Sequence, residues 1–236
     1  MYYNQTPQEH HWRSTVGNII NALITTIAVP IGLVIIYLIY IMSTNPHVSS
    51  HELYYSAGIF AVLLCLVALG LVIWYLVALS NFANLIKEPT DRKNAQKIPN
   101  SYFLMLIGNI AVPILMIFLG ESIIHYHFLL IIFTCLPFII SAIGYGIMIS
   151  GFNGLSSSPT FNRECKSGFT NLKTSCILSL IALFISIISD FVSEHEASLL
   201  LNLANLGIGI ASIVLMFMGW SKVKNNCPYI EDEDTI

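Results

Sequence analysis

The chain has 236 residues, of which 56% are hydrophobic and 10% are charged, with a mean hydropathy of +0.75 and a formal net charge of −3. Soluble domains carry about 25% charged residues, so this composition excludes an ordinary water-soluble fold, and its hydrophobicity excludes intrinsic disorder. The low content of Lys and Arg also excludes a nucleic-acid-binding protein, which would display a basic stripe. The composition therefore indicates an integral membrane protein.

Six long stretches of the chain hold no Lys, Arg, Asp or Glu, and a bilayer-spanning helix needs about 20 mainly apolar residues. The predicted fold class is an all-α integral membrane protein with six transmembrane helices. In chain order, these are expected at 16–42, 56–85, 102–123, 128–152, 172–192 and 198–222. Residues 1–15 are expected to form a cytoplasmic N-terminal segment before the bundle (16–222), and residues 223–236 an acidic cytoplasmic tail.

The charges predict the orientation of the helices. If the six helices alternate in direction, all 10 Lys and Arg residues fall on one side of the membrane. The opposite loops carry only acidic residues: Glu52, Glu121, Asp190, Glu194 and Glu196. Because basic loops stay in the cytoplasm, both termini are predicted to be cytoplasmic, in a plasma membrane or a bacterial inner membrane. None of the five cysteines falls on the outer side, so no disulfide is expected.

The chain also contains an internal similarity. Residues 65–90 align with residues 135–160 at a constant offset, and the matches run past the apolar part into the following loop. The matched pairs are Cys65/Cys135, Leu66/Leu136, Tyr75/Tyr145, Ser80/Ser150, Phe82/Phe152, Leu85/Leu155, Pro89/Pro159 and Thr90/Thr160. This pattern predicts three tandem αα-hairpins, at about 16–85, 102–152 and 172–222. The alternative is that apolar segments resemble one another by composition alone.

Small residues spaced four apart mark candidate packing faces, because helices in lipid associate through close backbone contact and polar side chains. One face lies on the fourth predicted helix and one on the sixth. The residues predicted to pack are Ala142, Gly146, Ser150, Gly207 and Ala211. The alternative is that the small and polar side chains line a path for a substrate.

No acidic or basic residue lies in the interior of a predicted helix, where one would indicate a functional site. The chain also lacks an H-E-x-x-H zinc motif, a P-loop, a G-x-S-x-G elbow and a C-x-x-C pair. The sequence therefore predicts a protein that is not an enzyme and that needs no cofactor.

Five of the seven histidines fall on the predicted outer side, together with the outer carboxylates. Histidine and carboxylate together suit zinc or copper, and histidine also senses pH near 6. The candidate metal-binding or pH-sensing residues are His47, His51, Glu52, His125, His127 and His195. The alternative is that these residues are polar caps at the ends of helices.

Two classes of function remain. The first is an accessory or binding protein that acts on another membrane protein, such as an immunity or regulatory protein for a pore-forming system. The second is a channel, or a permease subunit energised by a separate ATPase. The expected partners are the lipid bilayer and another membrane protein or a second copy of this chain, and not nucleic acid.

The predicted topology is testable by single-cysteine labelling after replacement of the native thiols. A reagent that cannot cross the membrane should reach cysteines at positions 49, 126 and 193 in intact cells. Cysteines at positions 94 and 167 should react only after lysis, because the loops that hold them are predicted to be cytoplasmic. Labelling of position 94 in intact cells would contradict the topology.

Overall fold

The structure, a computed structural model, describes residues 7–43, 50–124, 127–192 and 195–226, except for the side chains of 42, 50–55, 111, 113–124, 127–134, 190–191 and 195. The described residues form helices and short connections, without a strand. The helices are α1 (Pro7–Ser43), α2 (Ser50–Leu85), α3 (Pro89–Ile124), α4 (His127–Ser157), α5 (Arg163–Phe191) and α6 (His195–Asn225). In the described part, α1, α2, α4, α5 and α6 are long and apolar enough to cross a membrane. The all-helical prediction is confirmed, and the pattern is that of a multi-pass membrane protein.

Each predicted helix is present, but several begin well before their apolar stretch. Helix α1 begins at Pro7 and α3 at Pro89, so each has proline at its first position, where the missing N–H removes no helical hydrogen bond. Helix α5 begins at Arg163, and its N-cap Asn162 accepts a hydrogen bond from the backbone N–H of Cys165 at 2.8 Å. The absence of charge marks only the apolar part of each helix, so the polar first turns were missed.

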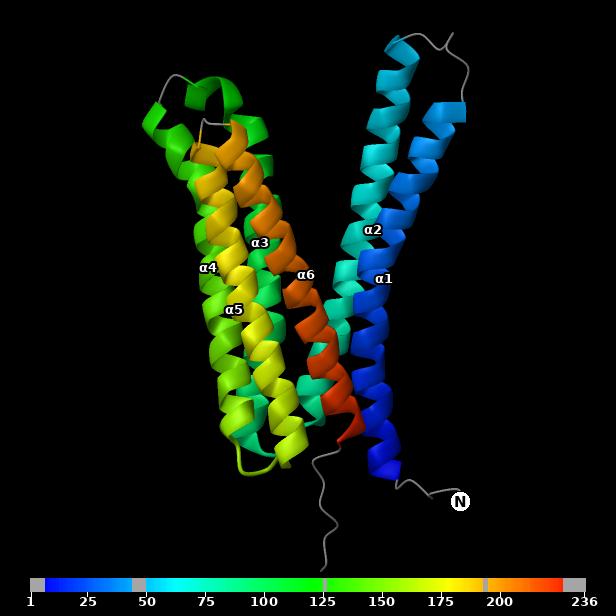
Figure 1. The fold of residues 1–236 in the computed structure, drawn as a ribbon, viewed down its shortest axis with the longest axis vertical. Helices are drawn as coiled ribbons and strands as arrows, with labels where there is room; N and C mark the ends of the chain where they lie inside the picture. Colours follow the sequence, from blue (N-terminus) through cyan, green and yellow to red (C-terminus); the bar gives the residue numbers. More distant parts are fainter. Residues whose placement is uncertain (1–6, 44–49, 125–126, 193–194, 227–236) are drawn as a thin grey trace, which may run out of the picture.

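The six helices contact one another as a ring in chain order. Each helix contacts the next one along the chain, and α1 contacts α6 to complete the circle. Toward the upper end in Figure 1, α1 and α2 lean away from the group of α3, α4, α5 and α6. The ring is therefore closed at its lower end and open toward the top.

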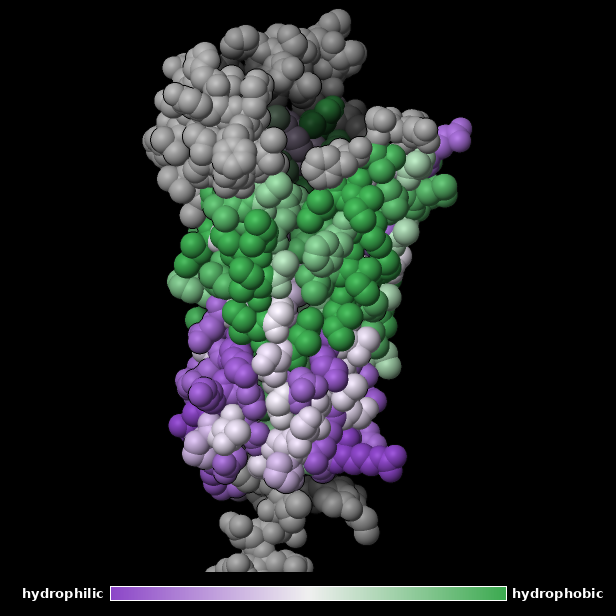
Figure 2. Space-filling view, turned by 90° about the vertical axis from the view of Figure 1, so that its left-hand side faces the viewer, coloured by the Kyte–Doolittle hydropathy of each residue, from purple (hydrophilic) through white to green (hydrophobic). Residues whose placement is uncertain are grey.

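The surface divides into an apolar band and a polar stem. We define the stem as residues 7–23, 78–102, 147–174 and 219–226. The exposed large hydrophobic residues of the structure all lie outside these ranges, and all 10 Lys and Arg lie inside them. Figure 2 shows the same division, with a green band above a purple lower end. Above the stem, residues 24–43 of α1 span about 30 Å, the thickness of a bilayer's hydrocarbon core.

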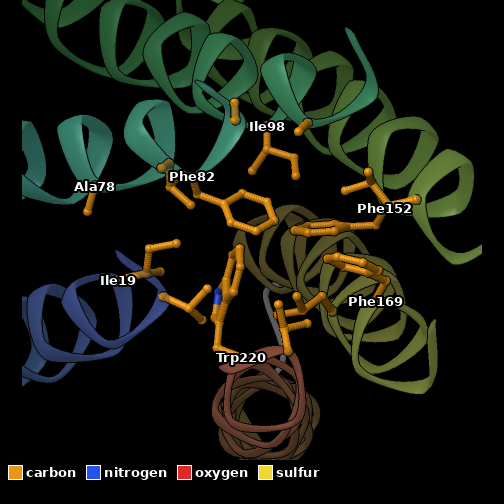
Figure 3. Packing of buried hydrophobic residues seen from close by; sticks show 14 of the residues in the cluster. Ile19, Ala78, Phe82, Ile98, Phe152, Phe169 and Trp220 are labelled. Carbon is orange, nitrogen blue, oxygen red and sulfur yellow. The ribbon is translucent and has the colours of Figure 1, made fainter. Parts of the chain in front are cut away.

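Most of the buried core lies in the stem. Its largest members form a group that we call the aromatic cluster: Trp12, Phe82, Phe152, Phe161, Phe169 and Trp220. In Figure 3, Phe82, Phe152, Phe169 and Trp220 converge on the middle of the ring. The ring centroid of Trp220 lies 5.3 Å from that of Phe82 and 6.2 Å from that of Phe152. The stem is thus packed like a water-soluble protein, which fits its polar surface.

Two polar contacts hold the stem together across long stretches of chain. The indole Nε1 of Trp12 donates a hydrogen bond of 2.8 Å to the backbone carbonyl of Val223, which joins α1 to α6. Val223 lies in the last turn of α6, where carbonyls lack a partner within the helix. The hydroxyl of Ser158, between α4 and α5, donates to the buried carboxylate of Asp91 in the first turn of α3 at 2.6 Å.

The Trp12 contact predicts the outcome of a conservative substitution. Trp12→Phe keeps a large ring but leaves the buried Val223 carbonyl without its donor, which should lower the free energy of unfolding by about 2 kcal/mol. Trp74→Phe is the matched control, because Trp74 is 42% exposed in the apolar band. Thermal unfolding of both variants in detergent measures the difference. Equal melting temperatures would show that the indole hydrogen bond adds no stability.

Candidate functional site

A cavity of about 300 Å³ lies at the centre of the ring, directly above the aromatic cluster. Five helices, α2 to α6, contribute to its wall. The polar members of that wall carry hydroxyl, thiol or indole groups, and no lining residue is acidic or basic. The polar lining residues are Tyr75, Tyr102, Tyr145, Ser175, Cys176, Ser179, Ser212 and Trp220.

One side of the cavity is a cluster of three serines between α5 and α6. The hydroxyl of Ser175 donates to the carbonyl of Ser212 at 2.8 Å, and the hydroxyl of Ser212 donates to the carbonyl of Ser175 at 2.9 Å. The hydroxyls of Ser179 and Ser212 lie 2.7 Å apart. These serines satisfy one another and join the two helices, as interhelical polar groups do in membranes.

The wall of the cavity also carries three tyrosines from three different helices. The rings of Tyr75 and Tyr102 meet edge to face, with centroids 5.3 Å apart. The hydroxyl of Tyr75 interacts with Tyr102 and Trp220, and that of Tyr145 interacts with Ser179. A tyrosine hydroxyl both donates and accepts, so these residues offer hydrogen-bonding capacity of both kinds without charge.

The cavity adjoins a groove higher in the apolar band. The groove is lined by Ala182 of α5 and by Asn202, Asn205, Leu206, Gly209, Ile210 and Ile213 of α6. Ala182, Gly209 and Ile213 line both spaces, so the cavity and the groove adjoin at these three residues. We call this space the α6 groove.

The physical character of the cavity limits what it holds. An apolar void of 300 Å³ without an occupant would cost about 7 kcal/mol at about 24 cal/mol per Å³. The hydroxyl-bearing wall instead suits about ten waters or an uncharged organic group of similar volume. A charged occupant would lose its hydration without gaining an ion pair from these walls.

The small residues that were predicted to pack α4 and α6 do not line the cavity. Gly146 and Gly207 are exposed, and a Cβ atom at either would meet nothing within 4 Å. Ala211 is also exposed, whereas Ala142 is half-buried and the hydroxyl of Ser150 accepts a hydrogen bond from Lys97 Nζ at 3.2 Å. The two predicted faces therefore do not supply the close approaches between the helices of this chain.

The close approaches between helices use other glycines. On α4, a Cβ atom at Gly151 would lie 2.8 Å from the backbone oxygen of Asn94. Between α5 and α6, a Cβ atom at Gly168 would lie 2.8 Å from the carbonyl of Gly219, and one at Gly219 would lie 2.9 Å from the carbonyl of Gly168. Helix α4 therefore does pack through small residues, but Gly151 and Gly146 are five positions apart and lie on different faces.

The candidate metal or pH site cannot be assembled from the part of the chain that is described. His47 and His125 lie outside the described residues, and the side chains of His51, Glu52, His127 and His195 lie outside the description. The backbone places these four near the starts of α2, α4 and α6. Among the described residues, no group of three or more His, Cys, Asp or Glu side chains is suited to hold a metal ion.

The tyrosines of the cavity were not predicted as a site, although the sequence contains one signal for them. Tyr75 and Tyr145 are equated by the internal alignment, and both line the cavity. Phe82 and Phe152 are equated as well, and both contact Trp220. These two matched pairs therefore meet near the ring axis, whereas Leu66 of another pair is 61% exposed and Tyr102 has no such signal.

No family model matches the chain, and neither a curated protein nor a solved structure matches it.

The two glycines of α4 form a matched pair for testing the packing. Gly151→Ala should lower the free energy of unfolding by about 1–3 kcal/mol, because the backbone of Asn94 cannot move away cheaply. Gly146→Ala should be neutral or stabilising by up to about 1 kcal/mol, because it gains helix propensity in open space. Thermal unfolding in detergent compares the two variants. A greater loss for Gly146→Ala would show that its face makes the essential contact.

Proposed function

We propose that this chain is a non-enzymatic accessory protein of the membrane, which acts by binding another membrane protein through the α6 groove. An immunity or regulatory protein for a pore-forming system is one example of this class. The partner contributes a transmembrane helix, which lies against Asn202, Asn205 and Gly209. The groove lies in the apolar band, where lipid tails offer no hydrogen bonds. A partner helix can supply polar groups there.

The observation that carries this proposal is the environment of Asn205. Asn205 is a half-buried residue that lines the α6 groove, and its carboxamide has no hydrogen-bond partner among the described residues. Asn202, one turn away, accepts a hydrogen bond from the hydroxyl of Ser189 at 3.2 Å. An unpaired amide in an apolar medium costs about 2–7 kcal/mol, so Asn205 favours a partner that supplies a polar group.

The proposed arrangement in the membrane follows the charges. The stem, with all 10 Lys and Arg, lies in the cytoplasm with both termini, in a plasma membrane or bacterial inner membrane. Three tandem hairpins account for the ring of contacts between successive helices. The acidic tail predicted at residues 223–236 begins within the last turn of α6, which ends at Asn225.

A channel or permease subunit is the second candidate, and the ring of six helices favours it. A ring with a hydroxyl-lined cavity on its axis is a natural start of a conduction path. Below the cavity, however, the axis is filled by the buried side chains of Phe82 and Trp220. The accessory role needs no opening of this cluster, and we therefore place it first.

Asn205→Leu tests the proposal. In cells, a photoreactive amino acid at Leu206 in the groove should crosslink to a discrete transmembrane partner, and Asn205→Leu should abolish that crosslink. In the purified chain, the same substitution should leave the melting temperature unchanged or raise it, because it removes an unpaired amide. The photoreactive group at Leu203, which is 57% exposed on α6 outside the groove, is the control position.

Two results would contradict the proposal. A fall in the melting temperature of purified Asn205→Leu would show that the amide serves an internal contact. Equal crosslinking from Leu203 and Leu206 would show random contact in the bilayer.

A further inference from the structure

We propose that the cavity at the centre of the ring binds an uncharged lipid with a small oxygen-bearing head group, of the monoacylglycerol type. The head group lies among the tyrosines and serines, and the acyl chain leaves through the α6 groove. This site goes beyond the accessory function, because its head-group end lies in the interior of the ring. The α6 groove, which takes the acyl chain, is also the surface offered to a partner helix, so the lipid and the partner share it.

The wall of the cavity selects the head group. The serines bond to one another at 2.7–2.9 Å, and the hydroxyl of Tyr75 interacts with both Tyr102 and Trp220. Tyr102 and Tyr145, each with one such contact, keep hydrogen-bonding capacity toward the cavity, because a tyrosine hydroxyl both donates and accepts. A head group with hydroxyl and ester oxygens gives the tyrosines acceptors and donors. A phosphate or carboxylate would find no cation on the wall, so charged lipids are disfavoured.

The position of the cavity suits a lipid. It lies where the apolar band meets the stem, because Phe152 and Trp220 line it and also belong to the aromatic cluster. In the opposite direction it joins the α6 groove, whose Leu206, Ile210 and Ile213 are apolar. A single amphipathic molecule therefore meets polar groups at one end and apolar groups along its length.

Gly209 controls the passage between the two spaces. It lines both of them, and a Cβ atom there would meet nothing within 4 Å, so a larger side chain fits without strain on the backbone. Gly207 is two residues away on the same helix, has equally open surroundings and lines neither space. Leucine at either position gains the same helix propensity, but only at 209 does it obstruct the passage.

The experiment uses the full chain in phosphatidylcholine nanodiscs and a monooleoylglycerol analogue with a diazirine near the glycerol end of its chain. Irradiation should label peptides that contain cavity residues, such as Tyr102 or Ser175. Unlabelled monooleoylglycerol should compete with this labelling. Oleoyl lysophosphatidic acid, which has the same chain and glycerol but carries a phosphate, should not compete. Gly209→Leu should reduce the labelling about tenfold relative to Gly207→Leu.

Further variants keep the test decisive. Ala182→Leu obstructs the same passage from α5 and should also reduce labelling. This variant replaces Gly209→Leu in the test if the Gly209→Leu chain does not fold. The nanodiscs hold the purified chain without any partner protein, so lipid labelling is measured independently of the crosslink from Leu206 in cells, and each of the two proposals can fail without the other. Labelling confined to lipid-facing residues such as Leu200, equal labelling of both glycine variants, or equal competition by lysophosphatidic acid would overturn the proposal.

Discussion

Trp12 joins the two ends of the chain, and the arrangement of the six helices depends on this closure. In this ring, successive helices are held together by the loops that connect them. Only the contact between α1 and α6 has no connecting loop. The Trp12 indole makes it by donating to the Val223 carbonyl of α6, while its ring packs against Phe82 of α2 at a centroid distance of 5.5 Å. The contact lies in the stem, where water drives apolar side chains together. The bilayer offers no such drive, since lipid tails are as apolar as leucine.

This difference between stem and band explains the shape of the molecule. In the stem, large side chains fill the ring axis and hold the helices together. Above it, α1 and α2 gain nothing by burying apolar surface against the other helices, and Figure 1 shows them leaning away. Contacts that persist in the band rely on close backbones and hydroxyls, such as the serines of α5 and α6. The cavity forms at this change of packing, where phenylalanine and tryptophan give way to tyrosine, serine and glycine.

The sequence predicts the elements of this fold better than their contacts. Stretches without charge locate all six helices, because a charge in a bilayer is costly. The same criterion misses the first turns of α1, α3 and α5, which stand in the polar stem. Small residues recur on more than one face of α4, and spacing alone does not show that Gly151 rather than Gly146 approaches a neighbour. That choice depends on how α3 and α4 are rotated, which is set by long-range packing.

The cavity was still harder to predict, because its residues come from five helices and none carries a charge. Only the match between Tyr75 and Tyr145 joins distant segments. Tyr102 and the serines look like ordinary residues of membrane helices until the ring brings them together. Uncharged sites of this kind leave little trace in composition, since hydroxyl side chains also serve to pack helices.

The path into the cavity bears on the choice between binding and transport. Passage along the ring axis would require Phe82, Phe152 and Trp220 to separate, and these side chains are at most 3% exposed. Such a movement would also disturb the ring contact between Phe82 and Trp12, whose centroids lie 5.5 Å apart. Entry from the side, through Gly209 and the α6 groove, requires none of these changes. A cavity that adjoins the α6 groove and is closed toward the stem fits the proposed binding within the membrane better than conduction across it.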